Sequence, residues 1–261
     1  MTESCLSRMK EFPGVSDQTA LRAACGKVKV IEGCQSVKGV PIFHYDRDGK
    51  DKKKQKILVF SLIHGDEVPA GAVARIWMER LETIEPRNQW RVVPILNPDG
   101  YQLKTRTNAD EVDINRNFPT KDWEAKAKEY WQKTTHSNHR RFPGDRANSE
   151  PETQCALKQI EDFKPDFVVS IHTPLKVLDF DGPKLAPPKF EYLPWKTLGH
   201  YPGSLGRYMW YERKVPVLTM ELKEDLPKSE KPFVELQDII GLLVGLEAGK
   251  PLQSAKSATQ E

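Results

Sequence analysis

The sequence lacks several features that would assign it to a class at once. No apolar run reaches the ~18 residues needed to span a bilayer, and the first residues contain no apolar stretch typical of a signal peptide. No internal repeat is visible. The net charge is only +3 although 30% of the residues are charged, so nothing indicates a nucleic-acid partner. We therefore expect a globular chain without membrane insertion or nucleic-acid binding, and its oligomeric state is left open.

Cysteine is scarce, and three of the four residues lie near one end, at Cys5, Cys25 and Cys34, with Cys155 far away. The absence of a CxxC pair excludes a zinc knot or a thioredoxin-like redox motif. An even number is compatible with an N-terminal disulfide in an oxidising compartment. Scattered reduced thiols are the simpler interpretation, because no signal peptide is visible. We therefore expect a cytoplasmic protein, with a periplasmic location as the alternative if Met1 follows a removed signal peptide.

The pattern of apolar residues indicates an α/β fold. A length of 261 residues with 38% apolar residues fits one large domain, which we place at 36–249 between an N-terminal lead-in (1–35) and a frayed tail (250–261). Alternating or continuous apolar runs predict strands at 28–32, 40–46, 56–63, 90–96, 166–172 and 215–222. Helical spacing predicts helices at 70–84, 121–132, 149–163 and 232–249. The alternation of strand and helix after residue 55 is typical of parallel βαβ units.

Chemically reactive side chains stand where three of the predicted strands end. His64 and Glu67 follow the strand at 56–63, His172 ends the strand at 166–172, and Glu221 ends the one at 215–222. The carboxyl ends of parallel strands meet at one edge of a sheet, where sites are built. Two histidines and one glutamate can form a catalytic zinc site with one position left open for water. The remaining histidines have no such setting, and we expect them at the surface or in secondary positions: His44, His136, His139 and His200.

The polar segment at 97–119 carries a recognisable set of motifs. It reads NPDG at 97–100, then Arg-x-Asn at Arg106 and Asn108, then VDINRNFP at 112–119. FPGDRANSEPET, VVSIH and LTMEL follow in order. Together these motifs resemble the zinc carboxypeptidase (M14) family over residues 36–248. The resemblance implies a mixed, mostly parallel twisted sheet with helices on both faces, and one bound zinc ion.

The resemblance also implies a role for each matching residue. His64, Glu67 and His172 match the zinc ligands, and Glu221 matches the catalytic glutamate. Arg106 matches the arginine that polarises the scissile carbonyl, and Asp113 the carboxylate that orients the first zinc histidine. Asn115 and Arg116 match the pair that holds the substrate's terminal carboxylate, and Tyr201 the substrate-contacting tyrosine. A planar guanidinium at Arg116 suits bidentate binding of a carboxylate, which a lysine would bind less specifically.

Within the family, the motifs HGDE, SEPET and YPGS resemble the branch of small murein peptide amidases. That branch implies hydrolysis of the γ-D-Glu–meso-diaminopimelate amide in L-Ala-γ-D-Glu-meso-diaminopimelate, in the recycling of cell-wall peptides. Two enzymatic alternatives stay open: a periplasmic cell-shape carboxypeptidase acting on muropeptides, and a general metallocarboxypeptidase. A peptidoglycan-binding module without catalysis is the alternative from another class, and the retained Glu221 and metal ligands argue against it.

Overall fold

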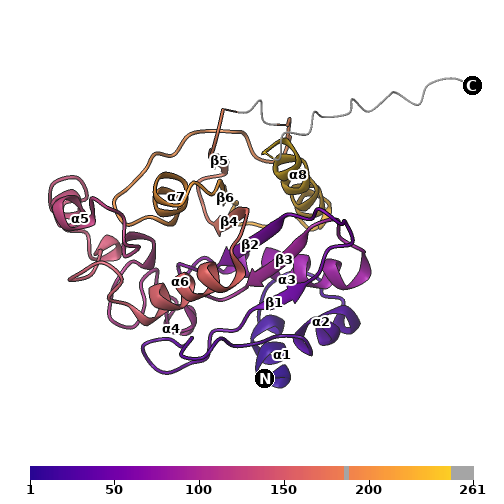
Figure 1. Cartoon of the computed structure of the whole chain (residues 1–261). Coiled ribbons are helices and arrows are strands. Elements are labelled where there is room, and N and C mark those ends of the chain that lie inside the picture. Colours follow the sequence, from indigo (N-terminus) through magenta and orange to yellow (C-terminus); the bar gives the residue numbers. More distant parts are fainter. Residues whose placement is uncertain (185–187, 248–261) are drawn as a thin grey trace, which may run out of the picture.

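A six-stranded mixed sheet forms the centre of the molecule (Figure 1). The computed structural model describes residues 1–184 and 188–247. The four central strands run parallel, and the strand at each edge is antiparallel to its neighbour. From one edge to the other, the strands are β1 (Tyr45–Arg47), β3 (Gln89–Val93), β2 (Lys56–Ser61), β4 (Phe167–His172), β6 (Val217–Glu221) and β5 (Val177–Asp181).

Helices cover both faces of this sheet, which confirms the predicted architecture (Figure 1). One face packs against α1 (Thr2–Lys10), α2 (Gln18–Cys25), α3 (Val68–Thr83) and α8 (Lys231–Glu247). The other face packs against α6 (Pro151–Phe163), α7 (Leu205–Arg207) and the π-helical turn η3 (Tyr208–Glu212). The connection from β3 to α6 contains α4 (Pro98–Leu103), η1 (Ile114–Arg116), α5 (Trp123–Lys133) and η2 (His139–Arg141).

The central strands are apolar on both faces because both faces are covered. In β2, Ile57 and Val59 contribute to one core and Leu58 and Phe60 to the other, as expected for a strand in the middle of a parallel sheet. The parallel strands β2, β4 and β6 have their carboxyl ends at the same edge. There His172, the last residue of β4, pairs in register with Glu221, the last residue of β6.

The predicted hairpin at 28–46 is only partly formed. Isolated bridges join Lys29 to His44 and Gln35 to Pro41, and the regular strand β1 begins only at Tyr45. Pro41 has no N–H to donate, which interrupts a ladder at this point. His44, which forms one of these bridges, is 3% exposed and thus not at the surface.

Two of the elements that were not predicted lie close to the ends of the central strands. The segment 97–119, which has little apolar periodicity, begins with the short helix α4. The edge strand β5 was also missed, and it carries Asp179 and Asp181. The chain that follows β5 returns along this edge, where Trp195 bridges to Leu178.

The cysteines are paired, which corrects the expectation of reduced thiols. Cys5 bonds to Cys25, joining α1 to α2, and Cys34 bonds to Cys155 in α6. The second pair spans a sequence separation of 121 residues, so only the tertiary fold brings its members together. Residues 1–35 are thus fastened to the body of the fold, and the boundary at residue 35 stays a prediction. The predicted tail at 250–261 lies outside the described residues, and no described helix is long and apolar enough to cross a membrane.

We predict that the two disulfides stabilise the fold unequally. In the chain-entropy model, closing the 20-residue separation of Cys5–Cys25 contributes about 3 kcal/mol and closing the 121-residue separation of Cys34–Cys155 about 5 kcal/mol. Replacing both members of each pair with alanine should therefore lower the free energy of unfolding more for Cys34 and Cys155. Denaturant titration of the two double variants measures this, and an equal loss in both variants, or a larger loss for Cys5 and Cys25, would contradict it.

Candidate active site

The metal-ligand candidates lie where β2 and β4 end. His64 follows β2 in the loop to α3, Glu67 is the N-cap residue of α3, and His172 is the last residue of β4. Gly65 allows this loop to pack tightly, because a Cβ at Gly65 would collide with the backbone of Gly100 in α4. The HGDE and NPDG motifs are thus in direct backbone contact, which places His64 and Glu67 beside each other.

Three electron-rich groups converge in this cluster. His64 Nδ1 lies 2.8 Å from Glu67 Oε1, and His172 Nδ1 lies 2.9 Å from Glu67 Oε2. The two Nδ1 atoms are 3.2 Å apart, and all three residues are at least 95% buried, with exposures of 2%, 5% and 1%. Burial opposes ionisation of Glu67, but the two histidines outweigh it and hold the pKa of its carboxyl well below the usual range. Groups packed this closely share positive charge, which a protonated imidazole can supply and which a bound metal ion can replace.

The geometry of the cluster fits zinc. Ligand atoms in a tetrahedral zinc site, each about 2.0–2.1 Å from the ion, lie roughly 3.3–3.4 Å from one another. The separation of 3.2 Å between the two Nδ1 atoms is close to that value. His64, Glu67 and His172 together form a group able to hold a metal ion. Two imidazole nitrogens and one carboxylate are one of the donor sets found in catalytic zinc sites.

The outer nitrogen of each histidine has its own partner. His64 Nε2 lies 3.1 Å from Asp113 Oδ1, and His172 Nε2 lies 2.8 Å from Ser170 Oγ. Burial would raise the pKa of Asp113, but Arg106 and His64 outweigh burial and hold the pKa far below its usual range. The ionised carboxylate accepts a hydrogen bond from Nε2–H, which leaves the lone pair of Nδ1 for the metal. The hydroxyl oxygen of Ser170 accepts the corresponding hydrogen bond from the Nε2–H of His172.

Arg106 lies against the same carboxylates. Its Nε and Nη2 are each 3.0 Å from Asp113 Oδ2, and its Nη1 is 3.6 Å from Glu67 Oε1. A guanidinium carries five N–H donors, so these contacts leave others to face the pocket. Arg106 is therefore held beside the metal group by ion pairs that fix its orientation.

Arg116 forms a second, more isolated cationic position. It is only 7% exposed, its Nη1 donates to the carbonyl oxygen of Asn115, and the ring of Tyr201 lies 4.6 Å away. Among the described residues, its Nε has no hydrogen-bond partner. Burial lowers the pKa of this guanidinium, and Asp113 opposes the shift. Asn115 Oδ1 accepts from the N–H of Leu205 at 2.8 Å, so the amide NH₂ of Asn115 is free to point into the pocket.

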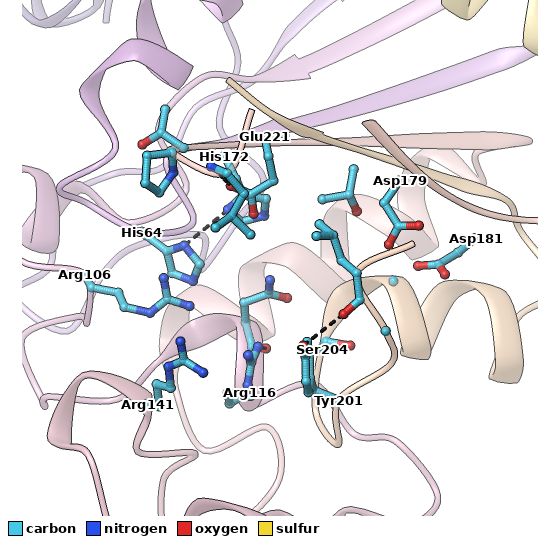
Figure 2. A pocket seen from close by; sticks show the side chains of 18 residues that line it. His64, Arg106, Arg116, Arg141, His172, Asp179, Asp181, Tyr201, Ser204 and Glu221 are labelled. Atoms are coloured by element: carbon cyan, nitrogen blue, oxygen red, sulfur yellow. Dashed lines mark hydrogen bonds between the residues drawn. The ribbon is translucent and has the colours of Figure 1, made fainter. Parts of the chain in front are cut away.

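All of the predicted site residues gather around one cavity of about 220 Å³ (Figure 2). His64, Arg106, Asn115, Arg116, His172, Tyr201 and Glu221 line it. Glu67 and Asp113 lie behind the histidines. Glu221 is positioned by β6 and by the N–H of Leu175, which lies 3.3 Å from its Oε2. The structure thus brings together residues that are spread over 158 positions of the chain, from 64 to 221.

The cavity also contains residues that the sequence reasoning missed. Arg141 in η2 and the acids Asp179 and Asp181 in β5 line it. The segment VLDFD does alternate with period two, which is a strand signal that would have placed both acids on one face. No comparable signal marks Arg141. Figure 2 shows Arg106 and Arg141 at one end of the cavity, the two aspartates at the other, and Glu221 and Arg116 between them.

Comparison with known proteins agrees with this geometry. The family model described as zinc carboxypeptidase matches residues 19–180, which is more than half of the chain. The chain belongs to the zinc carboxypeptidase family. Murein peptide amidase A from Vibrio campbellii (strain ATCC BAA-1116) is 31% identical over 199 residues, which cover 72% of this chain and 77% of that protein.

Other relatives agree with the assignment. Murein peptide amidase A from Escherichia coli (strain K12) is 33% identical over 148 residues, covering 56% of this chain and 59% of that protein. The crystal structure of murein-tripeptide amidase MpaA from Escherichia coli O157 superimposes with a TM-score of 0.61 at 25% identity, covering 91% of this chain and 95% of that one. Bovine thrombin-activatable fibrinolysis inhibitor shares the fold, with a TM-score of 0.69 at 15% identity, covering 95% and 97%.

We predict that Asp113 supports metal binding through His64. The Asp113→Asn variant loses the ionised acceptor of the Nε2–H, and zinc affinity should fall about 10- to 100-fold. Competition with a chromophoric chelator measures the affinity. The matched control is Asp110→Asn, three residues away in the same loop. If the two variants bound zinc equally tightly, the role assigned to Asp113 would be wrong.

Proposed function

We propose that this protein is a zinc-dependent murein peptide amidase that hydrolyses the γ-D-Glu–meso-diaminopimelate amide of L-Ala-γ-D-Glu-meso-diaminopimelate. The observation that carries the proposal is the 31% identity to a murein peptide amidase A over 77% of that protein's length. The pocket supplies what the reaction needs: a metal-binding group, a free carboxylate and buried cations within one cavity. The expected biological role is the recycling of cell-wall peptides.

The substrate binds by its charged end. In this proposal, Arg116 and the amide of Asn115 bind the terminal carboxylate of the diaminopimelate residue. Arg116 lines the cavity, and only its Nη1 makes a hydrogen bond, to the carbonyl oxygen of Asn115, among the described residues. The planar guanidinium therefore keeps donors for bidentate binding of a carboxylate. Tyr201, whose hydroxyl donates to the carbonyl oxygen of Leu198 at 2.9 Å, covers the guanidinium and contacts the bound residue.

Two further residues take part in bond cleavage. Glu221 lies beside His172 at the end of the sheet, where it accepts the proton of the attacking water and passes it to the leaving amine. Arg106 donates hydrogen bonds to the oxygen of the scissile carbonyl as negative charge develops there, a contribution often worth about 3–4 kcal/mol per donor. Zinc held by His64, Glu67 and His172 supplies acidification of water and polarisation of the carbonyl.

We further propose the periplasm, rather than the cytoplasm, as the compartment. Both disulfides lie in the fold, one of them joining distant segments, and structural disulfides persist in oxidising compartments. Thiol labelling of the protein as it is extracted from cells tests this proposal. Both pairs should be oxidised, and free thiols at these four positions would contradict it.

Product analysis by mass spectrometry tests the activity. Purified protein incubated with L-Ala-γ-D-Glu-meso-diaminopimelate should release diaminopimelate, and the Glu221→Gln variant should slow this about 10²- to 10⁴-fold while still binding zinc. A chelator should stop release by the parent protein. If the parent released C-terminal residues only from ordinary L-peptides, the general carboxypeptidase would replace the murein assignment. Binding of murein peptides without any cleavage would favour the non-catalytic module.

A further inference from the structure

The cavity has an acidic end that none of the proposed catalytic steps uses. Asp179 and Asp181 project from β5, which pairs antiparallel with β6. Asp179 is opposite Thr219, and Asp181 is opposite Val217. Residues 177, 179 and 181 share one face of the strand because side chains alternate along it. Val177 is opposite Glu221. Asp179 and Asp181 therefore lie progressively farther from Glu221 along β5.

Both carboxylates are buried, and the described residues offer them no lysine or arginine. Asp179 is 5% exposed and Asp181 is 6% exposed. Within residues 1–184 and 188–247, no lysine or arginine forms an ion pair with either of them. Burial raises the pKa of Asp179, and burial together with the neighbouring Asp179 raises the pKa of Asp181 to about 7. Backbone hydrogen bonds from Leu198 and Phe180 favour the ionised form of Asp179 but do not offset its burial. Ionising both buried carboxylates is therefore costly unless a cation binds between them.

His200 does not complete the pair. Its Nδ1 is 3.0 Å from Asp181 Oδ1, but this nitrogen is buried and makes no aligned hydrogen bond among the described residues. Burial lowers the pKa of His200, with Asp179 opposing the shift, so the imidazole favours its neutral form. The described residues therefore place no lysine or arginine against these two acids, and a bound ammonium group would favour their ionised forms.

The short helix α7 leaves room for these carboxylates. Gly206 faces Asp181, and a Cβ at that position would collide with Asp181 Oδ2. Gly206 also lines the cavity. A side chain at Gly206 would displace the Asp181 carboxylate, so the glycine keeps the acid in place beside the cavity.

We propose that Asp179 and Asp181 bind the ammonium group on the side chain of the released residue and so select residues whose side chains carry one. This inference rests on the proposed function, because it takes Arg116 to hold the α-carboxylate of that residue. The side chain then extends along β5 and β6 toward the aspartates. An ammonium group offers three donors and no acceptor, which matches two carboxylates, and diaminopimelate carries such a group at its far end.

The test compares two tripeptides that differ only in this ammonium group. One ends in meso-diaminopimelate, and the other ends in 2-aminopimelate, which has the same chain and the same two carboxylates. The parent protein should prefer the first by about 10- to 100-fold in kcat/KM, the range for a charge-assisted hydrogen bond. Asp179→Asn and Asp181→Asn should each lose most of this preference through slower cleavage of the diaminopimelate peptide, with little change for the aminopimelate peptide.

Titration calorimetry with the free amino acids gives a second readout that needs no catalysis. The parent should bind meso-diaminopimelate more tightly than 2-aminopimelate, and the two asparagine variants should bind both alike. The matched control is Asp145→Asn, whose side chain is 91% exposed and pairs with Lys128. This control should keep the full preference. Thermal unfolding and zinc content verify that each variant is folded.

The outcomes separate the two proposals. If neither tripeptide is cleaved but the parent still prefers diaminopimelate in the calorimeter, the aspartates keep their role and the substrate assignment fails. If the parent cleaves both peptides equally and binds both amino acids equally, the role of the aspartates is overturned and the amidase activity stands. An equal loss for both peptides in the asparagine variants also overturns it, since a structural role alone gives that result.

Discussion

The convergence of two imidazole nitrogens on one carboxylate is the constraint on which the rest of the structure depends. His64 Nδ1 and His172 Nδ1 lie 3.2 Å apart and share the two oxygens of Glu67. These groups come from the end of β4, from the loop that follows the adjacent parallel strand β2, and from the N-cap residue of α3. A shift of register between β2 and β4 would separate them. The apolar, doubly covered sheet is therefore what gives the metal group its geometry.

Charged side chains surround the metal-binding group at three positions of the cavity. Asp113 connects His64 to Arg106, so the metal group and the nearest arginine share one buried carboxylate. Arg116 lies farther out, with a buried nitrogen that lacks a partner in the described chain. The aspartates of β5 lie at the opposite end of the cavity. A ligand with a carboxylate at one position and an ammonium group at another complements both, whereas an uncharged peptide end complements neither.

Much of this site could be predicted because its signals are local. The apolar runs at 56–63, 166–172 and 215–222 are strands in the structure at nearly the same bounds. Each of these strands ends beside a residue that can bind a metal or transfer a proton. The sequence alone therefore indicates the zinc ligands. The roles of Arg106 and Arg116 came from resemblance alone.

What was missed depends on contacts between distant segments. The pairing of Cys34 with Cys155 spans 121 residues and leaves no trace in local spacing. The hairpin at 28–46 was predicted from alternation, but Pro41 limits it to isolated bridges. Strand β5 lies at the sheet edge with two acids on its cavity face, so its composition is unlike that of a buried strand. It supplies the acidic end of the cavity.

The central claim is that His64, Glu67 and His172 hold one zinc ion, and anomalous diffraction from crystals of the zinc-loaded protein tests it most directly. Data on either side of the zinc absorption edge locate the ion independently of the protein coordinates. The account predicts one peak within about 2.0–2.2 Å of both Nδ1 atoms and of a Glu67 oxygen. A zinc peak elsewhere, with none between these three side chains, would contradict it.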